Sequence, residues 1–140
     1  MAKISGLGDY FAVDDSGGTL RDISTDIRSL DVNIAQNLLD ITGIDKSAME
    51  RLIGLADGTI TVTGIFDAST ANKAHDVFKT RTGTRTVDYK IGGNTSGNPY
   101  LTMEMLVTSY VPVHNADGSL TFTAGLSLQS GTTPTWSTVP

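Results

Sequence analysis

Alternation of apolar and polar residues runs along most of this chain and predicts a protein built mainly of β-strands. A clear example is the stretch at residues 54–67, GLADGTITVTGIFD, where Ile60 and Val62 share one face. Thr59 and Thr61 occupy the other face. Because neighbouring residues of a strand point to opposite sides, this pattern predicts one face in a core and one face in water.

The strongest predicted hairpin lies late in the chain. Residues 101–108 and 119–128 both alternate, and between them Asp117-Gly118 supplies the residues that a tight turn requires. A shorter strand is predicted over residues 86–91, ending at the turn-forming run IGGNTSGNP.

Two further hairpins are predicted in the first third of the chain. The N-terminal stretch DYFAVDDSGGTLRDIS alternates around a turn at residues 15–18. Residues 27–42 resemble a second hairpin, in which a strand containing Val32 turns at Ala35-Gln36 and returns through NLLDIT.

Helical spacing occurs in two places. In DASTANKAHDVFK, apolar residues recur every three or four positions through Ala71, Ala74 and Phe78, which predicts a helix capped by Asp67 or Ser69. In IDKSAMERLIG, the serine and the glutamate three residues later fit a capping box, which predicts a short helical turn.

These elements predict one mainly β (α+β) domain over residues 1–140. We expect a β-sandwich or flattened β-barrel of about seven strands, with one flanking α-helix and a long inter-strand loop. Residues 1–8 form an N-terminal arm in this interpretation. Residues 130–140 form a C-terminal arm, because TPTWSTVP offers no pattern for a partner.

Composition narrows the classes of function. With 140 residues the chain can bury a core, and without cysteine it has no disulfide or thiolate site. A net charge of -5 disfavours tight binding to phosphate or to anionic lipid. The N-terminus lacks a signal-peptide pattern, and no apolar run approaches the ~20 residues of a membrane span. We expect a soluble protein made in the cytoplasm.

Catalytic and metal-binding patterns are not evident. His114 in a turn and His75 on a helix surface have no orienting partner in the sequence, and two histidines make a poor zinc set. The run GGNTSGN lacks the lysine and helix of a phosphate loop. Asp31 and Asp40 face each other across the predicted second hairpin, but no aromatic cleft accompanies them. We therefore expect no enzyme activity, no cofactor and no metal.

The order of elements resembles a known family. An N-terminal arm, a β-hairpin, a long connection, LADGTITVTGIFD, a helix and the terminal hairpin VPVHNADGSLTFTAGLSLQSG follow one another over roughly residues 5–130. This layout is similar to that of the major tail tube proteins of long-tailed bacteriophages, which are related to the tubes of contractile injection machines.

The resemblance implies a structural virion protein. Six copies would form a ring and stacked rings a tail tube, through which double-stranded DNA passes without specific binding. The protein would be made in the host cytoplasm and located in the phage tail, without membrane insertion. Its partners would be further copies of itself, a tape-measure protein, and tail-terminator and baseplate proteins.

Candidate residues follow from this layout. Polar positions on predicted hairpin strands are lumen candidates, with a solvated outer face as the alternative: Asp31, Asp40 and Glu104. Apolar positions in the long connection at residues 43–57, together with one residue of the C-terminal arm, are candidates for contacts between subunits and rings: Met49, Leu52, Ile53, Leu55 and Trp136. The alternative for the connection is that it covers the open end of its own sandwich.

Two other classes of function remain open at this stage. Threonine-rich strands also suit a non-catalytic β-sandwich that binds carbohydrate or a surface, and Trp136, Tyr100 and Tyr110 are the aromatic residues available for it. An enzyme site formed between subunits rests only on the two histidines and scattered carboxylates.

Overall fold

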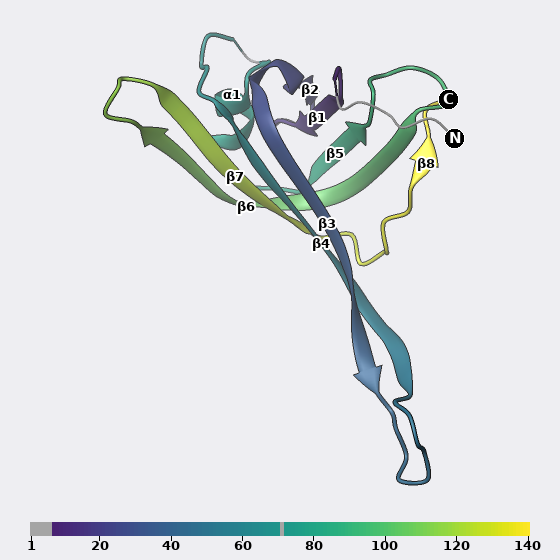
Figure 1. Cartoon of the computed structure of the whole chain (residues 1–140). Helices are drawn as coiled ribbons and strands as arrows, with labels where there is room; N and C mark the ends of the chain where they lie inside the picture. The colour runs from purple at the N-terminus through teal and green to yellow at the C-terminus, as the bar shows by residue number, and fades with distance from the viewer. Residues whose placement is uncertain (1–6, 71) are drawn as a thin grey trace.

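A computed structural model describes residues 7–70 and 72–140 and shows a mainly β protein, which confirms the predicted fold class (Figure 1). The strands are β1 (Tyr10–Asp14), β2 (Leu20–Asp22), β3 (Ile27–Asp40), β4 (Arg51–Ile65), β5 (Arg85–Lys90), β6 (Pro99–His114), β7 (Leu120–Leu128) and β8 (Ser137–Thr138). The helical elements are the 3₁₀ turn η1 (Ser24–Asp26) and the helix α1 (Ala74–Phe78). All strands pair antiparallel in one eight-stranded sheet of order β2-β1-β5-β6-β7-β4-β3, with β8 added to β6.

The sheet has a core face and an outer face, as the alternation predicted. On strand β4, Ile60 and Val62 are buried on the core face while Thr59 and Thr61 are exposed on the outer face. The sheet curls around α1, whose Phe78 packs against the core face. Other buried members of this core are Phe11, Val13, Ile23, Val77, Val87, Leu101, Met103, Met105, Phe122, Ala124 and Leu126.

The first and last predicted hairpins are confirmed. Strands β1 and β2 pair around a turn in which the Asp15 carboxylate accepts hydrogen bonds from the N–H groups of Gly17 and Thr19. Strands β6 and β7 pair around the Asp117-Gly118 turn, where Gly118 has φ +91. A positive φ is a conformation that glycine adopts without steric cost.

The predicted second hairpin is wrong. Strand β3 does not turn at Ala35-Gln36 but continues to Asp40, and its whole length pairs with β4. A β-bulge between Gln36 and Leu38 shifts the register where the turn was expected. Pairing with β4 satisfies more backbone groups than a turn without glycine would, so the strand runs on.

The predicted helical turn is also wrong. Residues 51–54 belong to strand β4, and residues 41–50 form the loop of a long β3–β4 hairpin. The backbone N–H of Glu50 donates to the Thr42 hydroxyl at 2.8 Å, and its carbonyl accepts from the N–H of Ile41. These bonds across the loop replace the capping box, because they continue the pairing of the strands.

Helix α1 is shorter than predicted. It begins after Lys73, and the backbone N–H of Ala74 donates to the carboxylate of Asp26 at 2.8 Å. Asp67 instead accepts from the N–H of Ser69 in a local turn. The predicted member Ala71 lies outside the described residues. The helix is therefore capped by a residue distant in sequence, which helical spacing cannot reveal.

The C-terminal segment belongs to the sheet. The expectation that the C-terminal arm lacks a partner is wrong, because β8 pairs with β6 and Val139 is buried. Of the predicted N-terminal arm, residues 1–6 lie outside the described residues.

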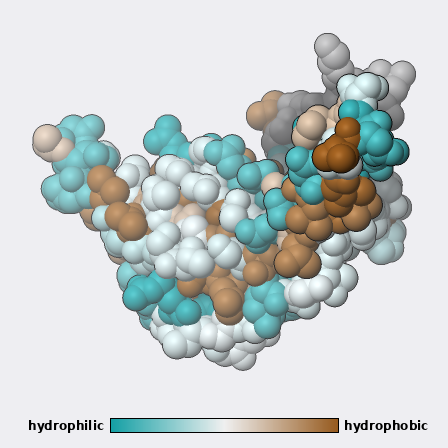
Figure 2. All heavy atoms as spheres, turned by 90° about the horizontal axis from the view of Figure 1, so that it is seen from below, coloured by the Kyte–Doolittle hydropathy of each residue, from teal (hydrophilic) through white to brown (hydrophobic). Residues whose placement is uncertain are grey.

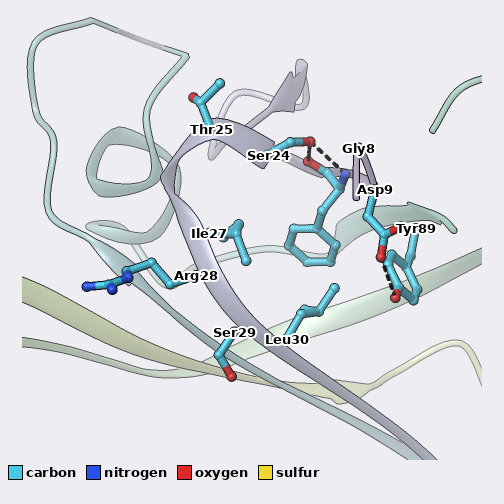
Figure 3. A pocket seen from close by; sticks show the side chains of 10 residues that line it. Gly8, Asp9, Ser24, Thr25, Ile27, Arg28, Ser29, Leu30 and Tyr89 are labelled. Atoms are coloured by element: carbon cyan, nitrogen blue, oxygen red, sulfur yellow. Dashed lines mark hydrogen bonds between the residues drawn. The ribbon is translucent and has the colours of Figure 1, made fainter. Parts of the chain in front are cut away.

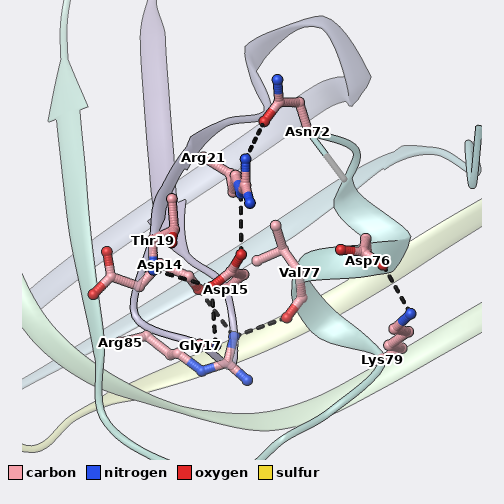
Figure 4. Close-up of polar contacts among 10 residues, drawn as sticks. All are labelled: Asp14, Asp15, Gly17, Thr19, Arg21, Asn72, Asp76, Val77, Lys79 and Arg85. Atoms are coloured by element: carbon pink, nitrogen blue, oxygen red, sulfur yellow. Dashed lines mark hydrogen bonds and ion pairs between the residues drawn. The ribbon is translucent and has the colours of Figure 1, made fainter. Parts of the chain in front are cut away.

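A buried arginine joins three parts of the fold. Arg85 is 1% exposed, and its guanidinium donates to the carbonyl oxygens of Val77 at 2.8 Å and Asp14 at 2.9 Å (Figure 4). It also donates to the carbonyls of Thr80 and Thr82. Burial lowers the pKa of Arg85, the neighbouring Asp15 and Asp14 acting in the opposite direction. The side chain holds the end of α1 against β1 and β5.

Glycine is required where β4 meets the start of β3. A Cβ on Gly64 would lie 2.0 Å from the carbonyl oxygen of Asp26 and 2.9 Å from a ring carbon of Phe122. Such distances are shorter than atomic contacts allow, so this close approach depends on the missing side chain.

We expect Gly64→Ala to destabilise the fold by about 3 kcal/mol, at the upper end of the cost of overpacking. The measurement is urea unfolding followed by circular dichroism. Gly17→Ala is the control, because a Cβ there meets only the Asp15 side chain at 3.4 Å. Equal midpoints for the two variants would contradict the close packing at Gly64.

Candidate functional site

The largest projection of the molecule is the end of the β3–β4 hairpin. Residues 37–55, called the arm from here on, extend past the rest of the sheet (Figure 1). Eight of its large apolar side chains are exposed: Leu38, Leu39, Ile41, Ile44, Met49, Leu52, Ile53 and Leu55. An isolated two-stranded ribbon is only marginally stable in water. A group of eight exposed large apolar side chains marks an interaction surface.

The arm is apolar on both of its faces. Leu38 pairs with Ile53, and Leu39 pairs with Leu52. Because neighbouring residues of a strand point to opposite sides, the two pairs lie on opposite faces of the ribbon. Within the described residues, no other element packs on either pair closely enough to bury it. A partner on one side would cover only half of this surface.

Polar contacts fix the shape of the loop that ends the arm. The Asp40 carboxylate accepts from the hydroxyl of Thr42 at 2.7 Å and from its N–H at 3.0 Å. These bonds from Thr42 lower the pKa of Asp40. Lys46 lies 3.6 Å from the Glu50 carboxylate, a weak exposed ion pair. The loop is thus ordered by its own contacts, which lowers the entropy lost on binding.

The outer face of the sheet is rich in hydroxyl groups. Paired rows bring Thr61 beside Asp31 and Thr63 beside Thr123. Figure 2 shows this region as largely white, the colour of residues near neutral hydropathy, with some brown apolar atoms among the white ones and a larger brown group on the arm. The wet face that the sequence predicted is therefore a broad surface of short polar side chains.

The lumen candidates fall in two places. Asp31 on β3 and Glu104 on β6 both lie on the outer face, where Glu104 accepts from the Thr86 hydroxyl at 2.6 Å. Asp40 lies in the arm, opposite Arg51. The predicted approach of Asp31 to Asp40 is wrong, because both belong to one continuous strand.

The residues predicted to make contacts between subunits also fall in two places. Met49, Leu52, Ile53 and Leu55 all lie exposed in the arm. Trp136 is half exposed at a distance from them, with its ring edge-on to Tyr89. Four further exposed apolar residues, on the partner strand and in the loop, were not among the predicted contact residues: Leu38, Leu39, Ile41 and Ile44. Leu39 and Ile41 alternate with Asp40 and Thr42, which is the signal in the sequence for a strand that continues past Gln36.

A groove of about 440 Å³ separates β1 and β5 from the first residues of β3 (Figure 3). Phe11 and Leu30 line it with apolar surface, and Arg28 stands at its rim. Across it the Tyr89 hydroxyl donates to the Asp9 carboxylate at 3.2 Å. Burial, helped by Asp9, raises the pKa of Tyr89 to about 12.

Among the described residues, His75 makes packing and hydrogen-bonding contacts inside the fold. His75 is not the solvated surface residue that was expected. It packs between Phe66 and Tyr110, with its Nδ1 atom 2.9 Å from the Tyr110 hydroxyl. Over residues 7–70 and 72–140, no three histidine or acidic side chains are grouped to hold a metal ion. The helices of the same residues are too short to cross a membrane.

Comparison with known proteins identifies the fold. No protein-family model and no curated protein matches the sequence. Among solved structures, a protein from the tail of an empty gene transfer agent particle with C6 symmetry aligns with a TM-score of 0.73. The alignment has 12% identity and covers 99% of this chain and 100% of the other.

Two further structures agree. The SPP1 tail tube protein aligns with a TM-score of 0.75 at 8% identity, over 97% of this chain and 80% of the other. A sheath/tube terminator structure of an extracellular contractile injection system gives 0.71 at 10% identity, over 98% of both chains. The chain therefore has the fold of tail tube proteins, and the fold expected from the resemblance is confirmed.

The Tyr89 contact predicts a loss of stability in strong alkali. An unfolded tyrosine ionises near pH 10, so the stability gained by keeping the phenol neutral is complete below pH 10. It is lost as the pH rises to about 12, the pKa of Tyr89 in the fold. We expect urea unfolding midpoints to fall over this range, and to fall less steeply in Tyr89→Phe. Identical slopes in the two proteins would contradict the contact.

Proposed function

We propose that this chain is a structural protein that assembles with copies of itself into stacked rings forming a phage tail tube. The observation that carries the proposal is the arm, which exposes apolar side chains on two faces and has a self-ordered loop. The tail tube fold supports it, and the C6 symmetry of the gene transfer agent tail supports rings of six.

The edges of the sheet suit lateral association. Strand β3 has 14 residues and, within the described chain, pairs with β4 on one side only. Its free N–H and C=O groups form a long edge that another chain can pair with. Heterologous contacts that close after a full rotation give a ring, and a ring leaves no such edge exposed.

The outer face supports a role as the wall of a conduit. It carries hydroxyl groups with acidic residues such as Asp31 and Glu104 on an acidic chain. A neutral to negative wall repels the phosphate backbone, so DNA could pass during ejection without being held. Lining of the lumen by Asp31 and Glu104 therefore remains our proposal, as does a role for Asp40 where the arm meets the bore.

Partners follow from the same proposal. The solved relatives include tube, sheath-tube and cap structures of injection machines, which supports further copies and a tail-terminator or baseplate protein as neighbours. A tape-measure protein inside the tube and location in the virion after cytoplasmic synthesis belong to the same hypothesis.

Replacing Leu52 and Ile53 together with Asp should prevent assembly and leave a folded monomer. The two residues lie on opposite faces of the arm, so the double variant places charge on both. Burying an unpaired carboxylate costs several kcal/mol, and the double variant introduces two of them into the contact. Analytical ultracentrifugation measures assembly, and circular dichroism checks the fold.

The matched control is Asn94→Asp with Ser96→Asp, which adds the same charge in the exposed turn before β6. We expect this control to assemble like the unmodified protein. If the Leu52→Asp, Ile53→Asp protein still forms polymers, the arm is not needed for assembly.

A lysine on the wall should make the tube hold DNA. We expect tubes of Asp31→Lys to bind duplex DNA in low salt and to release it as salt rises, since bound lysines displace counterions. Electrophoretic mobility shift measures the binding, with Asp76→Lys on α1 as a control of equal charge. If the two variants bind equally, Asp31 does not line the path of the DNA.

A further inference from the structure

The groove between β1, β5 and the start of β3 contains a carboxylate that has no cationic partner in the described chain. Asp9 accepts hydrogen bonds from the backbone N–H of Gly92 at 2.7 Å and from the Tyr89 hydroxyl at 3.2 Å. Both donors are neutral, and the ion pairs found within residues 7–70 and 72–140 do not include Asp9. A charge that is shielded from water is normally paired with an opposite charge, so this site lacks half of the expected pair.

Apolar and aromatic side chains surround this carboxylate. Figure 3 shows Asp9 and Tyr89 on one side of the groove, with Ile27 and Leu30 of β3 on the other. The Phe11 ring lies edge to face with Tyr89, at a distance of 6.4 Å between the ring centroids. Ile27, Leu30 and Tyr89 are themselves partly buried against the core. These walls limit the access of water to Asp9, which makes its attraction for a cation stronger than in open solvent.

The arginine at the rim does not supply the missing charge. Arg28 is exposed, and its guanidinium points away from Asp9 in Figure 3. In the described part of the chain Arg28 makes no ion pair. Its position limits the length of a ligand, because a second cationic group near the rim would be repelled.

We propose that this groove binds a small alkylammonium ion. The ammonium group donates to the Asp9 carboxylate, and the aliphatic stem lies along Phe11, Ile27 and Leu30. The groove volume of about 440 Å³ falls within the roughly 300–1,000 Å³ that is typical of small-molecule sites. All of these residues belong to one chain, so the site does not depend on the proposed assembly.

Other classes of ligand fit the groove less well. An anion is repelled by Asp9, and a neutral ligand leaves its charge unpaired. A calcium or magnesium ion needs about six oxygen ligands. Over residues 7–70 and 72–140, however, no three histidine or acidic side chains are grouped to hold a metal ion. A short organic cation with an apolar stem matches both the charge and the walls.

Saturation-transfer difference NMR with butylamine at pH 7 tests the site, because this method detects weak ligands on a monomer or on an assembly. We expect signals from butylamine and a dissociation constant on the order of 1 mM, as suits so small a ligand. Butanol and butyrate have similar stems but a neutral or a negative head group, and we expect much weaker signals from both. Equal signals from all three compounds would overturn the proposal.

Asp9→Asn removes the charge and keeps an oxygen that can accept from the N–H of Gly92. We expect butylamine binding to weaken at least about tenfold, because a charged hydrogen bond is lost. The matched control is Asp31→Asn, which removes the same charge from the outer face of β3 and should change binding by less than about twofold. Equal weakening in the two variants would show that only net charge attracts the amine, and would overturn the site.

Arg28→Glu tests the site without altering Asp9, in case circular dichroism shows that Asp9→Asn does not fold. Replacing the positive charge at the rim with a negative one should tighten butylamine binding about threefold. Unchanged or weaker binding would count against an ammonium group in the groove.

Acetyl-lysine methylamide separates a free amine from a lysine side chain of another protein. It carries the same ammonium group on a four-carbon stem, with two amide groups at the far end. Binding equal to or weaker than that of butylamine supports a free amine as the ligand. Binding more than about threefold tighter would indicate added contacts to peptide groups, and would overturn the free amine in favour of a docked lysine.

Discussion

Strand β4 is the constraint on which the molecule depends, because it belongs to two environments. Over its second half it lies between β3 and β7 with one face buried, and it forms the middle of the sheet. Over its first half only β3 accompanies it, and its leucine and isoleucine side chains stay in contact with water. The same strand thus holds the domain together and carries apolar surface that the rest of the described chain does not cover.

The two faces of the sheet carry different kinds of side chain. The core face is occupied by aliphatic and aromatic side chains, while hydroxyls and a few carboxylates cover the outer face. Exposed apolar residues break this division in the arm, at Leu106 and Ile65, and beyond the bulge in β6, where Val111 and Val113 face outward. In a monomer these apolar groups stay exposed to water and add no stability, whereas assembly would bury them.

The sequence predicted strands well where alternation was strict and turns where Asp-Gly or Asp-Asp-Ser-Gly-Gly stood between them. It failed where two local signals competed. Ser47 and Glu50 fit a capping box, yet backbone pairing across the arm determined the structure. The helix was overextended because its cap, Asp26, comes from a distant segment. Half of the arm was predicted as contact surface, and the other half was missed because β3 was ended too early.

The most direct test of the central claim is electron microscopy of the purified, unmodified protein in negative stain over a series of concentrations. Stacked rings with an open bore are the expected result, since the arm and the long β3 edge both need partners. A uniform monomer at every concentration would contradict self-assembly driven by these surfaces.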